Sequence, residues 1–82
     1  MSPELETLDQ LLGGDMPLAV IRMVFPDPNR FMSGMMGLLT DGQVRLFEGS
    51  TEVPSWRWHE ALSGRLADFR VQITKKGISQ IG

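Results

Sequence analysis

The sequence predicts an α+β fold in which an N-terminal helix and one inserted helix pack on a small, strongly bent antiparallel sheet of about five strands. Three observations lead to this prediction. Leucines recur at helical spacing near the start of the chain, an Asp-Gly pair follows an apolar stretch near its middle, and residues 69–73 alternate apolar and polar side chains. The 82 residues are enough for one core, so we expect a single domain over residues 1–82.

Residues 2–12 are predicted to form the N-terminal helix. Ser2 is a favourable N-cap, Pro3 suits the first helical turn, and a Gly-Gly pair ends the pattern. Four leucines line or flank one face of this helix: Leu5, Leu8, Leu11 and Leu12. We expect this face to cover the core.

Residues 16–26 form a near-continuous apolar run, which predicts a strand buried on both faces. The Pro-Asp-Pro-Asn segment at the end of this run is expected to be a loop, because proline lacks a backbone donor and biases its predecessor toward extended geometry.

Residues 30–39 fit either a strand or a helix. Gly34 and Gly37 each disfavour a helix by about 1 kcal/mol relative to alanine. The following Asp-Gly pair, residues 41–42, suits a type I′ turn, which needs a strand on each side. We therefore predict a hairpin between residues 30–39 and residues 43–47.

The C-terminal part of the chain is predicted to hold two more strands. Residues 69–73 alternate in polarity, as expected of a half-buried strand. A turn over residues 75–77 then leads to a last short strand carrying Ile78 and Ile81.

Residues 54–63 are predicted to form the inserted helix, which ends at Gly64. On a helix, Trp58 faces the core together with Leu62, whereas Trp56 lies about 160° away. On a strand, the alternative for this segment, both tryptophans would point to one side and belong to the core. The expected core comprises apolar residues from all of these elements: Leu8, Leu12, Val20, Val24, Leu38, Val44, Leu46, Trp58, Leu62, Val71 and Ile73.

The net charge of −2 conceals an asymmetry along the chain. Residues 1–53 carry three basic and eight acidic side chains, a net −5, whereas residues 54–82 carry five basic and two acidic ones, a net +3. Only the C-terminal third could attract an anion at long range. The alternative is that the two parts pack together and partly neutralise each other.

The sequence indicates no enzyme and no cofactor. It has no phosphate-binding loop, no dinucleotide turn, no cysteine and a single histidine, His59, whose expected role is structural rather than metal binding or proton transfer. Its acidic, polar start and the lack of an apolar run of about 18 residues predict a soluble cytoplasmic protein that does not contact membranes.

The leading functional hypothesis is a small non-catalytic interaction or regulatory module, with an unidentified protein or a second copy of itself as partner. A tryptophan exposed beside an arginine is typical of binding surfaces, so the expected contact residues are Trp56, Arg57 and Glu60. The other interpretation is that a loop or strand folds over Trp56. A second candidate for an apolar interface is the methionine cluster, Met32, Met35 and Met36, for which core filling is the other interpretation.

The alternative hypothesis is a nucleic-acid-binding module. A basic cluster beside the aromatic helix, with a winged-helix-like arrangement, could contact phosphates through five side chains: Arg57, Arg65, Arg70, Lys75 and Lys76.

A second route to nucleic acid is a family resemblance. The order of an N-terminal helix and a small bent sheet, with "NRFMSGMM" leading to "TDG" and a late "KKGISQI", is similar to Sm-like RNA-binding barrels. In that family a strand carries a glycine before an Asp–Asn pair, and a late "RG" precedes the last strand. Here the spacing from Gly34 to Asp41 is longer, the asparagine of the pair is missing, and "KKG" stands in place of "RG". The resemblance therefore implies a fold-level analogy and no site residues.

Overall fold

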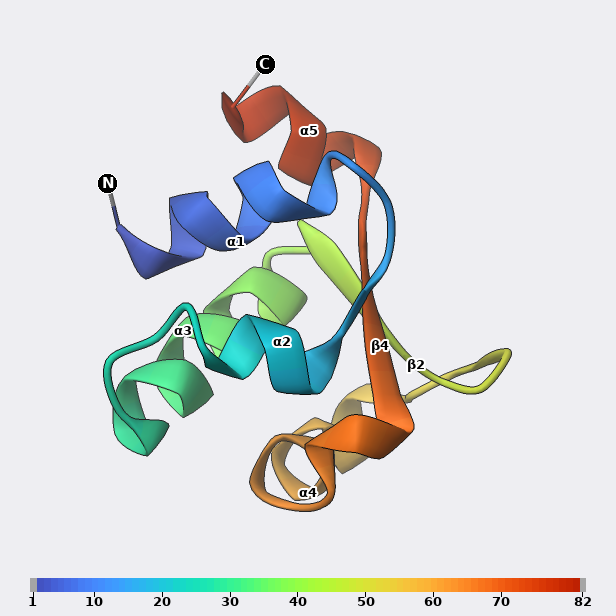
Figure 1. The fold of residues 1–82 in the computed structure, drawn as a ribbon. Coiled ribbons are helices and arrows are strands. Elements are labelled where there is room, and N and C mark those ends of the chain that lie inside the picture. The colour runs from blue at the N-terminus through green and yellow to red at the C-terminus, as the bar shows by residue number, and fades with distance from the viewer. Residues whose placement is uncertain (1, 82) are drawn as a thin grey trace.

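The computed structural model describes residues 2–81, and within them an antiparallel sheet of four strands lies in the order β1-β4-β2-β3 (Figure 1). The two central strands, β2 (Val44–Glu48) and β4 (Phe69–Ile73), pair along their whole length. The outer strands, β1 (Met16–Pro17) and β3 (Thr51–Glu52), contribute two residues each. The α+β class and the antiparallel pairing are confirmed, but the predicted strongly bent sheet of about five strands is wrong.

Helices lie on one side of this sheet and at its two ends. Within the described residues they are α1 (Pro3–Leu11), α2 (Leu18–Arg22), α3 (Pro28–Thr40), α4 (Trp58–Ser63) and α5 (Lys75–Ile81), with short 3₁₀ turns η1 (Ser55–Arg57) and η2 (Leu66–Asp68). In Figure 1, α1, α2 and α3 lie on one side of β2 and β4, while α4 and α5 lie at opposite ends of β4. None of the helices in the described part of the chain has the length and hydropathy that crossing a bilayer requires.

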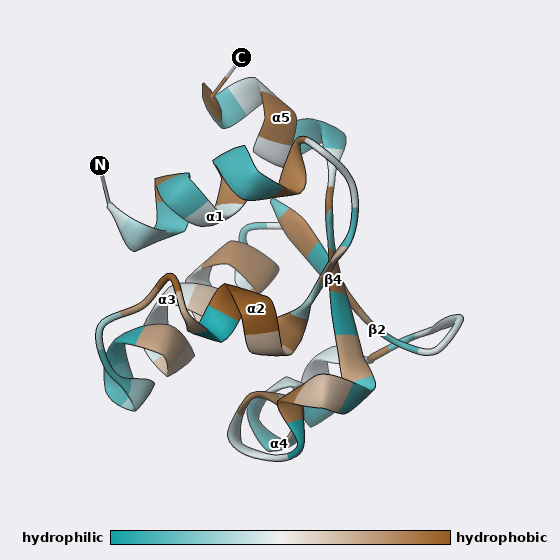
Figure 2. Ribbon diagram, in the orientation of Figure 1, coloured by the Kyte–Doolittle hydropathy of each residue, from teal (hydrophilic) through white to brown (hydrophobic). Residues whose placement is uncertain are grey.

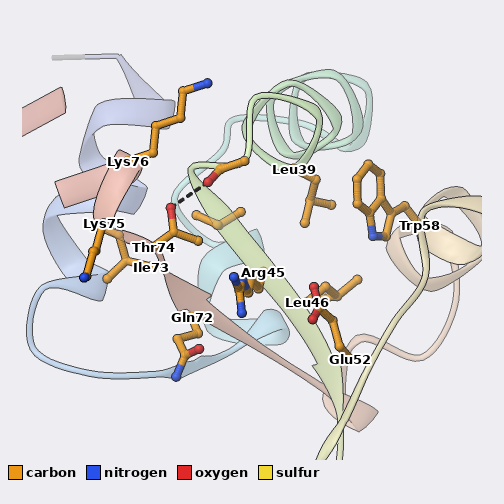
Figure 3. Close-up of a pocket in the computed structure, with 12 residues that line it drawn as sticks. Leu39, Arg45, Leu46, Glu52, Trp58, Gln72, Ile73, Thr74, Lys75 and Lys76 are labelled. Atoms are coloured by element: carbon orange, nitrogen blue, oxygen red, sulfur yellow. Dashed lines mark hydrogen bonds between the residues drawn. The ribbon is translucent and has the colours of Figure 1, made fainter. Parts of the chain in front are cut away.

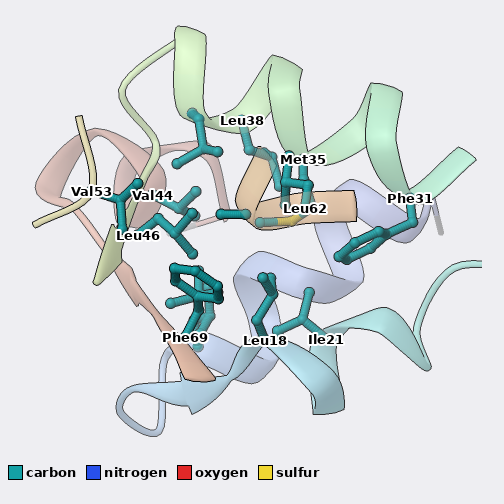
Figure 4. Packing of buried hydrophobic residues seen from close by; sticks show 14 of the residues in the cluster. Leu18, Ile21, Phe31, Met35, Leu38, Val44, Leu46, Val53, Leu62 and Phe69 are labelled. Atoms are coloured by element: carbon teal, nitrogen blue, oxygen red, sulfur yellow. The ribbon is translucent and has the colours of Figure 1, made fainter. Parts of the chain in front are cut away.

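The core lies between the three helices and one face of the sheet. Buried and exposed residues alternate along both central strands, so that Val44, Leu46, Phe69 and Val71 point inward. Figure 4 shows these strands meeting apolar side chains from α2 and α3, and Figure 2 shows the same alternation as changes of hydropathy along β4. Among residues 2–81, no helix lies over the other face of the sheet (Figure 1).

The N-terminal helix is confirmed. The Ser2 hydroxyl accepts a hydrogen bond from the Leu5 N–H at 3.2 Å, as an N-cap should. The buried side of the helix passes through Leu8 and Leu11, not through Leu12, which is 51% exposed where the chain leaves the helix. The prediction of Leu12 as a core residue is therefore wrong.

The apolar run at residues 16–26 is not a strand beyond Met16–Pro17; it forms α2 and the turn after it. Its buried side chains, Leu18, Ile21 and Phe25, recur at helical spacing. Val20 falls between them and is 39% exposed, so its assignment to the core is also wrong.

Residues 30–39 belong to α3, and the predicted strand there is wrong. Asp27 caps this helix by accepting a hydrogen bond from the Arg30 N–H at 2.8 Å, and Pro28 occupies the first turn. The segment that resembles Sm-like barrels is thus helical. The resemblance does not extend to the fold.

The predicted hairpin at Asp41-Gly42 is wrong as well, because this pair ends α3; Gly42 has a φ of 72°. A hairpin does form at the next turn of the chain. It joins β2 to β3 through Gly49 and Ser50, with Gly49 at a φ of 62°.

The predicted turn over residues 75–77 and the last strand are replaced by α5. The Thr74 hydroxyl accepts a hydrogen bond from the Gly77 N–H at 3.2 Å at the start of this helix. Ile81 packs against the core, whereas Ile78 is exposed.

Candidate functional site

The candidate contact surface is the turn that holds both tryptophans, residues 54–58, hereafter the Trp56 turn. It consists of the 3₁₀ turn η1, which leads directly into α4, and it begins with a hydrogen bond from the Arg57 N–H to the Pro54 carbonyl at 2.9 Å. The helical interpretation of residues 54–63 is therefore correct, and the strand alternative is wrong.

The two tryptophans have opposite roles in this turn. Trp58 packs against the core and its Nε1 donates a hydrogen bond to the Val53 carbonyl at 3.1 Å. Trp56 points away from the molecule and is 79% exposed. Trp58 thus fixes the turn, and Trp56 is presented to solvent.

Arg57 holds the turn from the other side. Its Nη1 lies 3.2 Å from Oε1 of Glu48 at the end of β2, and its Nη2 lies 3.6 Å from Oε1 of Glu60 in α4. The hydrogen bond to Glu48 raises the pKa of Arg57, against a smaller opposing effect of desolvation. The positive charge of the guanidinium is thus compensated by two carboxylates. Through them Arg57 links the turn to both the sheet and α4.

The five basic residues predicted as nucleic-acid contacts do not form one cluster. Arg57 is paired as above, and Arg65 lies beside Asp68, with 3.7 Å between Nε and Oδ2. The other three, Arg70, Lys75 and Lys76, lie along the outer face of β4 or at the start of α5.

Sequence reasoning missed two residues next to Arg70 on that face. Arg45 and Phe47 project from β2 on the side opposite Val44 and Leu46, because successive side chains of a strand point to opposite faces of the sheet. The signal was present in the sequence, but nothing in it indicates which face of a sheet a helix will cover.

Near the end of this face lies a groove of about 530 Å³ (Figure 3). In this view Leu39 and Trp58 lie on one side of β2, Gln72 and Lys75 lie on the other, and Arg45 extends from the strand between them. The groove therefore combines an apolar part with a basic, hydrogen-bonding part.

The methionines lie on α3. Met35 is fully buried in the core and cannot line a surface of this molecule, while Met32 and Met36 are partly buried against the core. This placement fits the core-filling interpretation.

His59 lies exposed on α4, where its backbone carbonyl accepts a hydrogen bond from the Ser63 hydroxyl at 2.8 Å. Among residues 2–81, no group of three or more histidine, cysteine, aspartate or glutamate side chains is placed to hold a metal ion.

Comparison of the chain with protein-family models, with curated proteins and with solved structures gives no match. The function is therefore inferred from the surface of the molecule itself.

Proposed function

We propose that the protein is a small non-catalytic interaction module that contacts a protein partner, or a second copy of itself, through the Trp56 turn. The observation that carries this proposal is the 79% exposure of Trp56 on a backbone held in place from two sides. A large aromatic ring fixed at the surface is the residue type most enriched at the energetic centre of protein interfaces.

The free energy available at this position is large for one side chain. Burying a tryptophan ring removes roughly 150 to 200 Å² of apolar surface from water, which corresponds to on the order of 4 kcal/mol. Because the ion pairs of Arg57 already order the turn, little further backbone entropy is lost when a partner covers the ring.

The charges around Trp56 suit the rim of such an interface. Arg57, Glu48 and Glu60 neutralise one another in part and remain partly exposed, so a partner can cover the ring without burying an unpaired charge. In this arrangement Trp56 contributes affinity, while Arg57 and Glu60 contribute orientation.

The test is sedimentation velocity over a range of concentrations for three proteins: wild type, Trp56→Ala and Met23→Ala. Met23 is 82% exposed in the segment after α2, so it is a matched apolar control at another place on the surface. If the partner is a second copy, the wild type and Met23→Ala dimerise with rising concentration and Trp56→Ala does not.

A second arm addresses a different partner. A photo-crosslinking side chain is placed at position 56 or at position 23 in the cells that make the protein. A discrete adduct that forms only at position 56, and that Arg57→Ala weakens, supports the proposal. Absence of both self-association and a position-specific adduct, with circular dichroism showing folded variants, contradicts it.

A further inference from the structure

The outer side of the sheet carries a second surface, hereafter the open sheet face, made of Arg45, Phe47, Arg70 and Gln72. Arg45 lies opposite Gln72, and Phe47 lies opposite Arg70, in the register of β2 and β4. Side chains of directly paired residues are close neighbours, with Cβ atoms about 5 Å apart. The four residues therefore form one contiguous block, of which Phe47 is partly exposed and the others are exposed.

Cations that lack a carboxylate partner gather at this face. Of the eight lysines and arginines, Arg30, Arg57 and Arg65 form all the ion pairs found among residues 2–81. Of the remaining five, four lie on the open sheet face or at the start of α5 beside it: Arg45, Arg70, Lys75 and Lys76.

The fifth, Arg22, is engaged elsewhere, because it donates to the Phe25 carbonyl at 3.1 Å and lies over the Phe31 ring. The segregation of free cations is therefore a property of this one surface.

The local charge is opposite in sign to that of the whole molecule. Two acidic residues adjoin this surface. Glu52 lies opposite Phe47 in the register of β2 and β3, and Asp15 accepts a hydrogen bond from Arg70 at its backbone carbonyl, at 3.2 Å. When the carboxylates of these two residues are counted against the four cations, the surface has a net charge of +2, whereas the whole chain has a net charge of −2. The surface can thus attract a polyanion despite the acidic composition.

Phe47 adds a feature that a general anion site does not need. It lies between two arginines, with Arg70 directly opposite and Arg45 two residues earlier on the same face of β2. An aromatic ring flanked by guanidinium groups on a sheet is a stacking platform for a nucleic-acid base, and Gln72 supplies an amide donor and acceptor next to it.

From this arrangement we propose that the open sheet face binds single-stranded nucleic acid. Phosphates contact Arg45, Arg70, Lys75 and Lys76, and one base stacks on Phe47. A single strand is favoured over a duplex because only an unpaired base can turn its ring onto the sheet. The strands are about 17 Å long, which limits the contact to a few nucleotides, and the groove beside Lys75 and Lys76 extends the contact beyond the strand end (Figure 3).

The open sheet face shares no residue with the Trp56 turn, and only Trp58 of that turn lines the adjoining groove. Trp56 and Phe47 therefore test the two proposals separately. Trp56→Ala is expected to leave nucleic-acid binding unchanged, and Phe47→Leu is expected to leave self-association or crosslinking at position 56 unchanged.

The test uses fluorescence anisotropy with labelled mixed-sequence single strands of DNA and RNA, titrated at salt concentrations from about 50 to 200 mM. With three or four phosphate contacts, the logarithm of the affinity should fall with the logarithm of salt at a slope of about −2 to −3. Arg45→Ala should weaken binding and reduce the magnitude of that slope by about 0.7.

Phe47→Leu separates stacking from charge. It keeps an apolar side chain of similar packing and should weaken binding about tenfold without altering the salt slope. Arg65→Ala is the matched control, because Arg65 is an exposed arginine that is paired with Asp68 and lies outside β2 and β4. The affinity of this variant should equal that of the wild type.

Three outcomes overturn the proposal, provided that circular dichroism shows all variants to be folded. They are no binding at about 50 mM salt, an equal loss in Arg65→Ala and Arg45→Ala, and full competition by polyglutamate together with an unchanged affinity of Phe47→Leu. The last result would mark the face as a general polyanion site.

Discussion

The ring of Phe25 lies directly against the backbone of Gly34 in the middle of α3. A β-carbon at position 34 would lie 2.5 Å from Cε2 of Phe25 and 2.7 Å from Oε2 of Glu4, closer than real atoms approach. Gly34→Ala should therefore displace the ring or the helix and lower the free energy of unfolding by about 1 to 3 kcal/mol, as measured by urea denaturation.

Gly37 provides the matched control for that substitution. It lies in the same helix, and a β-carbon there would meet nothing within 4 Å. Gly37→Ala should raise the free energy of unfolding by about 0.5 to 1 kcal/mol, since alanine restricts the unfolded chain and suits a helix. If both alanine variants were stabilised alike, the close contact with Phe25 would be wrong.

Two adjacent leucines at the end of α1 should respond very differently to truncation. Leu11 is 1% exposed in the core and Leu12 is 51% exposed. Leu11→Ala should lower the free energy of unfolding by about 2 to 5 kcal/mol, because it leaves a cavity, whereas Leu12→Ala should lower it by less than about 1 kcal/mol. Comparable losses in thermal or urea unfolding would argue against this orientation of the helix.

The hydrogen bond from Trp58 to Val53 predicts a distinct effect of Trp58→Phe. The ring is largely retained, but the Val53 carbonyl loses its indole donor, so the free energy of unfolding should fall by about 1 kcal/mol. The same variant leaves Trp56 as the sole tryptophan. Its fluorescence should be strongly quenched by iodide, whereas Trp56→Phe should report a shielded indole. Equal quenching in the two variants would contradict the opposite placement of the rings.

The ion pair between α1 and α3 predicts a pH dependence of stability. Arg30 donates to both carboxylate oxygens of Glu4, at 2.7 Å from Nη2 to Oε1, and lowers the pKa of Glu4 against the opposing effect of desolvation. Because folding favours the ionised form, the pair stabilises the protein above the unfolded-state pKa of about 4.3 and loses this effect as pH falls through the lowered folded-state pKa.

Glu4→Gln should accordingly lower the urea midpoint at pH 7, and its difference from the wild type should shrink as the pH falls below about 4. Glu6→Gln is the control, since Glu6 lies exposed in the same first turn and has no ion-pair partner among the described residues. A Glu4→Gln effect that is independent of pH would contradict a contribution from this charge.

The parts of the fold that could be predicted are those with an unambiguous local signal. The N-cap at Ser2 and the alternation over residues 69–73 led to a correct helix and a correct strand. The apolar run that forms α2 could not be assigned, because a short buried segment shows the same composition in a helix as in a strand.

The segments that form α3 and α5 were wrongly predicted as strands, although each begins with a recognisable helix-capping signal. Asp27 and Pro28 are a favourable N-cap and first-turn pair, and Thr74 is a favourable N-cap before α5. The glycines of α3 outweighed the first signal, because the close packing of Phe25 on Gly34 is a tertiary contact that no local pattern reveals.

The candidate sites also differ in whether a local sequence signal or a tertiary contact determines them. The opposite placement of Trp56 and Trp58 followed from helix geometry, whereas the exposure of Trp56 depends on whether another segment covers it and was left open by the sequence. The grouping of Arg45 and Phe47 with Arg70 depends on the register between β2 and β4, which joins segments far apart in the sequence and could not be predicted from either one.

β4 lies between β1 and β2, although it is the last strand of the described chain. The helices α1, α2 and α3 and the strand β2 are therefore synthesised before the strand that joins them, and their apolar sides cannot be fully covered until β4 is available. A chain that stops before Phe69 should be degraded rather than accumulate as a partly working fragment.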